Sequence, residues 1–173
     1  AAARANSAAP RLQAPAALAE EFAARFPHTE TDDQRRAIEE CLAGLADDRP
    51  SDRLICGDVG FGKTEVALRA AFAAAMSEKQ VALVVPTTLL CRQHFHTFSE
   101  RFADYPVRIG QLSRLVRAKQ AALVREGLAE GTIDIVPCTT WPEGSVRLIA
   151  FIGSSDIHPQ TEERSFIRTR WIS

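Results

Sequence analysis

The chain lacks the features expected of a membrane, secreted or zinc-binding protein. No apolar run in its 173 residues approaches the ~18 that a bilayer span needs, and no charged-then-apolar leader opens it, which disfavours membrane insertion and secretion. The 4 cysteines lie far apart, without a C-x-x-C pair or a histidine at zinc-ligand spacing, and are typical of buried thiols in a reduced, cytoplasmic protein. The net charge of −1 gives the chain as a whole no nucleic-acid signature.

Composition and element order indicate one α/β domain. The chain is 46% hydrophobic and 25% charged, enough to bury a single core at this length. Residues 1–17 are predicted to be an Ala/Pro-rich linker, residues 18–137 the domain, and residues 138–173 a separate tail. Strands that alternate with helices predict a mostly parallel sheet between helices. After two helices that begin near Leu18 and behind Thr31, the expected elements are helix 63–76, strand 81–85, helix 89–102, strand 107–112, helix 115–130 and strand 133–136.

The most informative motif fits the phosphate-binding pattern G-x-x-x-x-G-K-[ST] between a strand and a helix. Its members are Gly57, Asp58, Val59, Gly60, Phe61, Gly62, Lys63 and Thr64. Backbone N–H groups at such a helix N-terminus bind an anion, and glycine permits the left-handed angles and close approach that the loop requires. Lys63 is expected to contact the β- and γ-phosphates, and the Thr64 hydroxyl to ligate Mg²⁺. The motif predicts a nucleoside triphosphate site.

A second segment leaves a functional and a structural interpretation open. A buried strand runs into Pro86-Thr87-Thr88 and then a helix, a terminus suited to a nucleic-acid backbone phosphate. Alternatively, Pro86 only ends the strand and Thr88 is an ordinary helix N-cap. Between positions 101 and 125, basic side chains outnumber acidic ones, which is typical either of a phosphate-binding face or of a solvated helix surface.

Phe26 and Gln34 also have two interpretations. They precede the phosphate loop at a place from which a ring can stack on adenine while an amide reads the edge of the base. Alternatively, Gln34 closes a capping box that begins at Thr31, and Phe26 belongs to the core.

Together these segments resemble the first motor lobe of the bacterial transcription-repair-coupling factors, over about residues 20–137. Fork-reversing DNA helicases share the Gly-Asp-Val-Gly-x-Gly-Lys-Thr core, but Phe61 and the following Glu65-Val66-Ala67 are the coupling-factor form. The segments that carry the resemblance are Phe26-Pro27, Glu30-Thr31, Asp33-Gln34 and residues 53–67, 85–90, 106–109, 112–114 and 131–136.

The resemblance implies a RecA-like P-loop lobe of a double-stranded-DNA translocase. Such a motor uses ATP and Mg²⁺ to push stalled RNA polymerase off a lesion, and it recruits excision-repair proteins. It is expected to be cytoplasmic and monomeric, without a membrane partner. On the resemblance, Lys63 and Thr64 are the catalytic residues, Phe26, Gln34, Gly57 to Thr64 and Glu65 bind the nucleotide, and Thr87, Thr88, Ser113 and Arg114 contact the DNA backbone.

The resemblance stops after residue 136. There the family pattern has Gly-Thr-His and, some twenty residues on, an apolar strand that ends in Asp-Glu-Glu-His, whereas this chain has no Asp-Glu-x-His at all. Residues 148–153 are a candidate for the buried strand, which makes Asp156 the remaining candidate for a Mg²⁺-binding carboxylate. The last forty or so residues resemble unrelated sequence, and we expect them to be poorly packed or disordered. The sequence therefore predicts a truncated motor lobe, inactive on its own.

Two interpretations from other classes of protein stay open. A non-motor P-loop nucleotide binder or small-molecule kinase needs an arginine-rich lid after the third helix, and the Pro86-Thr87-Thr88 element argues against it. A non-catalytic fragment would bind nucleotide without turning it over. A fragment of a fork-reversing helicase is the alternative within the same superfamily.

Overall fold

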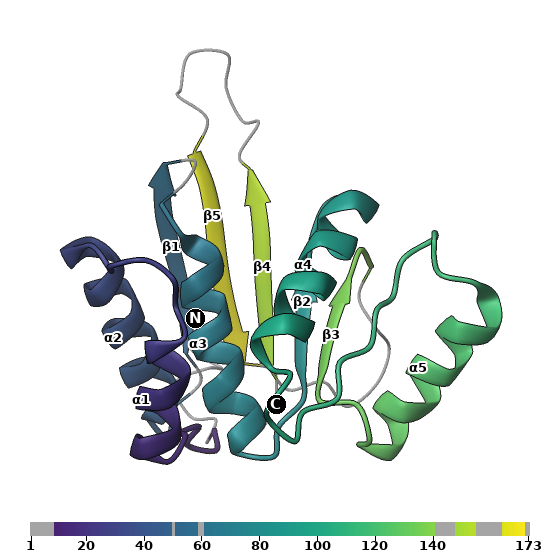
Figure 1. The fold of residues 1–173 in the computed structure, drawn as a ribbon, viewed down its shortest axis with the longest axis horizontal. Helices are drawn as coiled ribbons and strands as arrows, with labels where there is room; N and C mark the ends of the chain where they lie inside the picture. The colour runs from purple at the N-terminus through teal and green to yellow at the C-terminus, as the bar shows by residue number, and fades with distance from the viewer. Residues whose placement is uncertain (1–8, 50, 59–60, 141–147, 155–163, 172–173) are drawn as a thin grey trace.

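The computed structural model describes residues 9–49, 51–58, 61–140, 148–154 and 164–171. Within these residues, five helices and five strands form one layered α/β unit (Figure 1). The helices are α1 (Ala16–Ala24), α2 (Asp32–Ala46), α3 (Lys63–Met76), α4 (Thr88–Arg101) and α5 (Ala118–Glu130). The strands are β1 (Asp52–Asp58), β2 (Val81–Val84), β3 (Ile135–Cys138), β4 (Leu148–Ser154) and β5 (Arg164–Trp171).

The strands form one mixed sheet in the order β1-β5-β4-β2-β3. The pairs β2–β3 and β2–β4 are parallel, whereas β5 pairs antiparallel with both β1 and β4. The sheet is thus mostly parallel, as expected, and β5 is the strand that runs against the others (Figure 1).

The described part of the tail differs from the expectation of poor packing or disorder. Residues 148–154 and 164–171 are β4 and β5, and they lie between β1 and β2 in the middle of the sheet. The physical reason is backbone hydrogen bonding, because β1 and β2 would otherwise each present a row of unpaired N–H and C=O groups. The apolar run 148–153, the candidate strand of the sequence, supplies one of the two inserted strands.

The strand expected over residues 107–112 is wrong as a continuous element. The segment follows β3 in parallel but makes only isolated bridges, between Ile109 and Ile135 and between Leu112 and Cys138. Ile135 donates its N–H to Arg108, whereas Pro137 has no N–H with which to continue the ladder on this side. The segment still occupies the expected place, with α5 as the crossover to β3.

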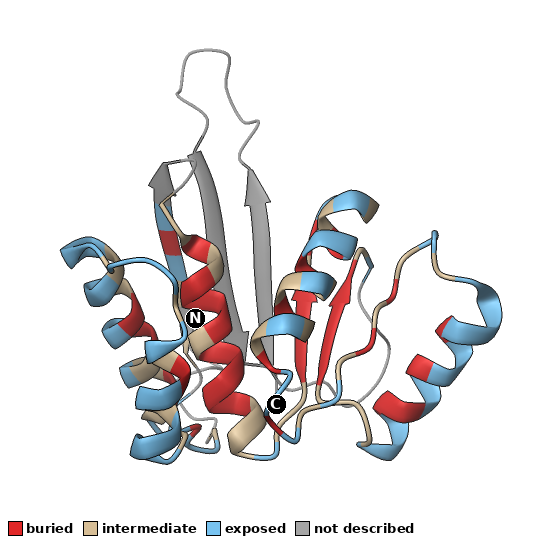
Figure 2. Cartoon of the chain, viewed as in Figure 1, coloured by how far each residue is buried: buried red, intermediate tan, exposed pale blue. Residues whose placement is uncertain are grey.

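Two apolar clusters cover opposite faces of β2 and β3, because successive strand residues point to opposite sides. Val81, Leu83 and Ile135 pack with α1, α2, α3 and α4, and Ala82 and Val136 pack with α5. Helix α3 is buried on almost every side (Figure 2).

The larger cluster contains a group of packed rings from α1, α3 and the residues that directly follow α4. The Phe22 and Phe72 rings are stacked with centroids 4.2 Å apart, and Phe102 and Tyr105 lie against both. At β1 only one face of the strand is covered by other described residues. Ile55, which faces the helices, is buried, whereas Leu54 on the opposite face is 59% exposed.

Candidate functional site

The described end of the phosphate loop has the backbone that the motif requires. Gly62 has a φ of 77° and is the N-cap residue of α3. Among the described residues no side-chain hydrogen bond caps this helix, and the backbone N–H groups at a helix N-terminus are suited to binding an anion. Lys63 begins the helix, 7% exposed, with its Nζ 5.7 Å from the centre of the Phe61 ring, and Thr64 is half-buried. Val59 and Gly60 lie outside the described residues, and Gly57 and Asp58 end β1.

Gln34 closes the capping box that the sequence allowed, and its side chain also contacts the phosphate loop. The capping box is present, since Thr31 Oγ1 accepts from the Gln34 N–H and Gln34 Oε1 accepts from the Thr31 N–H. At the same time Gln34 Nε2 donates to the Phe61 carbonyl at 2.5 Å. A Cβ at Gly62 would lie 2.6 Å from Gln34 Nε2. Gln34 therefore joins the start of α2 directly to the phosphate loop.

Phe26 is not a core residue. It is half-buried after the end of α1, outside both apolar clusters, and its ring meets the edge of His28 with centroids 5.4 Å apart. The alternative that Phe26 belongs to the core is therefore wrong, and its role as an adenine contact stays a prediction.

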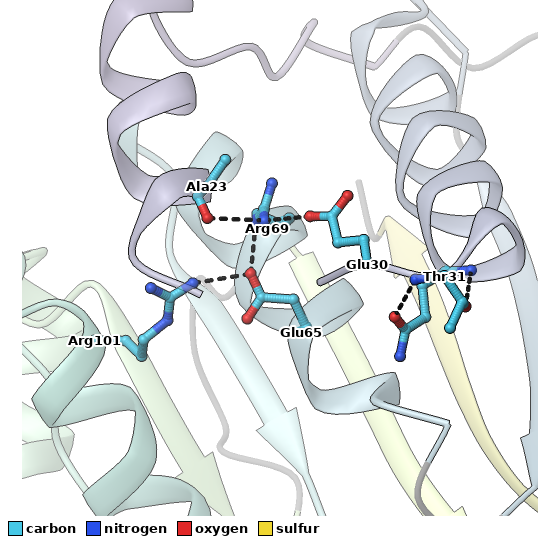
Figure 3. A network of polar contacts seen from close by, with 7 residues as sticks. Ala23, Glu30, Thr31, Glu65, Arg69 and Arg101 are labelled. Carbon is cyan, nitrogen blue, oxygen red and sulfur yellow. Dashed lines mark hydrogen bonds and ion pairs between the residues drawn. The ribbon is translucent and has the colours of Figure 1, made fainter. Parts of the chain in front are cut away.

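Glu65, a predicted nucleotide contact, accepts hydrogen bonds from two arginines through one oxygen of its carboxylate (Figure 3). Its Oε1 accepts from Arg69 Nε at 2.6 Å and from Arg101 Nη2 at 2.8 Å. Arg69 also donates to Glu30 Oε1 at 2.6 Å and to the Ala23 carbonyl at 3.4 Å. Glu65 is only 5% exposed, so this pairing offsets the cost of burying its charge.

The four residues predicted to contact DNA line one cavity of about 800 Å³. Thr87 and Thr88 come from the start of α4, and Ser113 and Arg114 from the segment that follows the bridge at Leu112. Residues from distant parts of the chain meet here because β2 and the 107–112 segment are parallel to β3, so that their carboxyl ends share one edge of the sheet. The structure thus brings the whole predicted set together.

The cavity contains polar groups suited to an anionic ligand. The Ser113 Oγ is buried and has no hydrogen-bond partner. Thr87 is the N-cap of α4, with its Oγ1 accepting from the Leu90 N–H at 3.2 Å, so its hydroxyl proton remains to donate to a ligand. The sequence had suggested Thr88 for this N-cap, and that alternative is wrong.

Three further lining residues were not singled out as site residues by sequence reasoning: Arg125, Thr139 and Thr140. Arg125 belongs to the basic stretch 101–125, so its charge was a signal, but only the fold shows that α5 carries it to this cavity. Thr139 and Thr140 follow β3 directly. Arg114 and Arg125 make the cavity cationic.

No group of three or more His, Cys, Asp and Glu side chains that could hold a metal ion occurs within the described ranges. Asp156, the candidate Mg²⁺ carboxylate, lies outside them. Among the described helices, none is long and apolar enough to cross a membrane.

The cysteines are buried as expected, except for one. Cys41, Cys91 and Cys138 are buried, and burial, together with the neighbouring Cys91, raises the pKa of Cys138 to about 12. Cys56 is exposed, because it lies on the uncovered face of β1.

Comparison with known proteins supports this arrangement. The DEAD/DEAH box helicase family matches residues 31–160, which include the loop, both threonines and the cavity segments. The chain belongs to the DEAD/DEAH box helicase family. Transcription-repair-coupling factors are among its relatives, with 56% identity to the Bacillus subtilis protein and 52% to that of Haemophilus influenzae, over 67% and 68% of this chain. The predicted resemblance is confirmed.

This helicase-family chain spans about 10% of the length of those curated relatives. Its fold is similar to a solved structure of RecG bound to a three-way DNA junction, with a TM-score of 0.73 and 31% identity over 80% of this chain and 19% of that one. The RecA-like fold class is therefore confirmed by both the family match and the structural likeness.

Proposed function

We propose that the chain is the ATP- and DNA-binding motor lobe of a double-stranded-DNA translocase of transcription-coupled repair. The observation that carries the proposal is that the residues predicted from the sequence to contact DNA line one cavity, namely Thr87, Thr88, Ser113 and Arg114. Identities of 50–56% to transcription-repair-coupling factors, against 31% to RecG, favour a coupling factor over a fork-reversing helicase. On this assignment RNA polymerase and excision-repair proteins are partners of the longer assembly, the protein acts in the cytoplasm, and the lobe itself is a monomer.

The described residues at the phosphate loop fit a nucleotide. The N-terminus of α3, a glycine with positive φ and an adjacent lysine are together suited to hold phosphate oxygens. Lys63 would hold the phosphates and Thr64 would ligate Mg²⁺, which neutralises charge on the transferred phosphoryl group when it is bound. Phe26 and Gln34 would hold the adenine. Gln34 donates a hydrogen bond to the Phe61 carbonyl of the loop. The proposed adenine contact and the conformation of the loop therefore depend on the same side chain.

The cavity fits the phosphate backbone of DNA and offers no means of reading its sequence. Its polar lining consists of hydroxyl groups, the start of α4 and two arginines, all of which donate to phosphate oxygens. A motor that moves along any DNA needs contacts of this kind.

ATP binding can be tested by calorimetry of the chain with Mg-ATP. We expect weak binding, in the high micromolar range or above, because only one side of the usual nucleotide clamp is present. Lys63→Ala should abolish the heat, whereas Lys79→Ala, a change outside the proposed site, should leave it unchanged. Equal heats for the wild-type chain and Lys63→Ala would refute the nucleotide site.

DNA binding can be tested by fluorescence anisotropy with labelled duplexes of unrelated sequence. Binding should be weak, equal among sequences and steeply reduced by salt, because phosphate contacts release counterions. Replacing both Arg114 and Arg125 by glutamine should reduce affinity and flatten the dependence on salt. Sequence-selective binding that survives high salt would contradict the motor assignment.

Hydrolysis should be absent from the 173-residue chain on its own, with or without DNA. The sequence has no Asp-Glu-x-His to hold the metal and position water. Loss of one stabiliser of developing charge typically costs about 10²- to 10³-fold in rate, and an arginine supplied in trans is worth roughly 10³ to 10⁵. Phosphate release at the rate of buffer is the expected result. Lys63-dependent turnover by this chain would instead indicate a self-sufficient P-loop enzyme.

A further inference from the structure

Helix α4 connects the two proposed sites at its opposite ends. Its N-terminus, with Thr87 as N-cap, lines the DNA cavity. Its last residue, Arg101, reaches the first turn of α3, where Glu65 directly follows the phosphate-loop residue Thr64. A helix of 14 residues is about 20 Å long, so the two sites share one rigid element.

The contact at the far end of α4 is a buried charge pair. The Glu65 side chain is 5% exposed and that of Arg101 13%, with Glu65 Oε1 2.8 Å from Arg101 Nη2. The Arg101 guanidinium also lies 4.5 Å from the centre of the Phe22 ring. A pair with so little access to solvent is weakly screened, so a shift of α4 acts directly on the position of Glu65.

Arg101 is not fully satisfied in this arrangement. Its Nε and Nη1 are buried and have no hydrogen-bond partner, whereas its Nη2 alone donates to Glu65 (Figure 3). Buried donors without acceptors raise the free energy of this arrangement. A small displacement of α4 that gives these N–H groups an acceptor would lower it. The Glu65–Arg101 contact is therefore a place at which two arrangements of α4 and α3 can differ in energy.

We propose that Arg101 is a positioning residue that couples the two sites through Glu65. Binding of DNA at the start of α4 changes the Glu65–Arg101 contact, and with it the first turn of α3 that holds the nucleotide. The inference rests on the proposed function, since it needs nucleotide at the phosphate loop and DNA at the cavity. By reciprocity, nucleotide changes the affinity for DNA by the same factor.

The test measures the dissociation constant of a fluorescent Mg-ADP for the full chain, with and without saturating double-stranded DNA. Their ratio is the coupling factor, which we expect to be about fivefold or more for the wild type. Arg101→Gln should bring the ratio to about one, while the affinity for Mg-ADP without DNA changes by less than about threefold. Arg101→Lys, which keeps the charge, should recover part of the ratio.

Arg25→Gln is the matched control. Arg25 also joins an ion pair, with Asp104 at 2.6 Å, and lies over a ring, 5.0 Å from the centre of Tyr105, but neither of these partners belongs to α3. The control should keep the wild-type ratio. The double variant Glu65→Gln/Arg101→Gln removes both charges of the pair, and it should show the same ratio as Arg101→Gln even if that single variant folds poorly.

The outcomes separate the two proposals. A wild-type ratio that survives in the folded Arg101→Gln or double variant overturns the coupling role, as does equal loss in Arg25→Gln. Binding of both ligands to the wild type with a ratio of one overturns the coupling role alone. Failure of the wild type to bind either ligand overturns the proposed function and the coupling role together.

Discussion

Replacement of Gly62 by alanine should destabilise the chain more than the same replacement at Gly131. Both glycines have positive φ, 77° and 73°, and both flank a helix, as the N-cap of α3 and the C-cap of α5. A non-glycine residue in the left-handed region costs about 1–2 kcal/mol, and this term is common to both variants.

The surroundings of the new Cβ differ between the two positions. At Gly131 nothing lies within 4 Å, whereas at Gly62 the Cβ would be 2.6 Å from Gln34 Nε2. Gln34 is a flexible side chain and will move aside, which breaks its hydrogen bond to the Phe61 carbonyl. One hydrogen bond contributes about 0.5–1.5 kcal/mol net, so Gly62→Ala should cost about 2–3 kcal/mol against about 1–2 for Gly131→Ala.

Urea denaturation followed by circular dichroism measures both free energies of unfolding. A third variant, Gln34→Ala, removes the side chain with which the Cβ collides. In that background Gly62→Ala should cost no more than Gly131→Ala, because only the conformational term remains. Two results would refute the proposed stabilisation of the loop by Gln34: an equal loss of free energy of unfolding for Gly62→Ala and Gly131→Ala in the wild-type background, or a difference between them that persists without Gln34.

Two further predictions concern titratable side chains. Burial lowers the pKa of His94 in the folded protein. As pH falls, the unfolded state, in which a histidine has a pKa near 6.5, therefore binds the proton before the folded state does. The free energy of unfolding should fall as pH drops below about 6.5. The slope of the free energy of unfolding against pH, at most about 1.4 kcal/mol per pH unit, should disappear in His94→Leu and persist in His96→Gln. An unchanged slope in His94→Leu would contradict the attribution of this pH dependence to His94. For the thiols, we expect a disulfide reagent at pH 8 to label Cys56 fast and Cys138, with its raised pKa, only on unfolding. Rapid labelling that remains in Cys56→Ala would show the core thiols to be accessible.

The phosphate loop and the α/β order were predictable because they depend on local patterns. The motif from Gly57 to Thr64 is a short stretch with fixed chemistry, and the helix expected over 63–76 agrees with α3 (Lys63–Met76). The capping box at Thr31 is equally local, since its partners are three residues apart. Such features need no knowledge of the rest of the chain.

The expectations that proved wrong depend on partners distant in sequence. A strand over residues 107–112 is locally reasonable, but Pro137 across the sheet interrupts the ladder. The described tail residues form β4 and β5 because β1 and β2 offer unpaired edges, which local patterns do not reveal. The contact between Glu65 and Arg101 depends in the same way on helix packing, because Arg101 lies on another helix.

The sequence by itself determined the local patterns on which both proposed sites depend: a glycine-rich loop that ends in Lys63 and Thr64, and threonines that follow a buried strand. Tertiary structure decided which of these groups meet. Only the parallel arrangement of β2, the 107–112 segment and β3 brings Thr87, Ser113 and Arg125 to one cavity, and only the packing of α4 on α3 sets Arg101 against Glu65. Residue type is encoded locally, whereas distance between residues far apart in sequence is set by sheet order and helix packing.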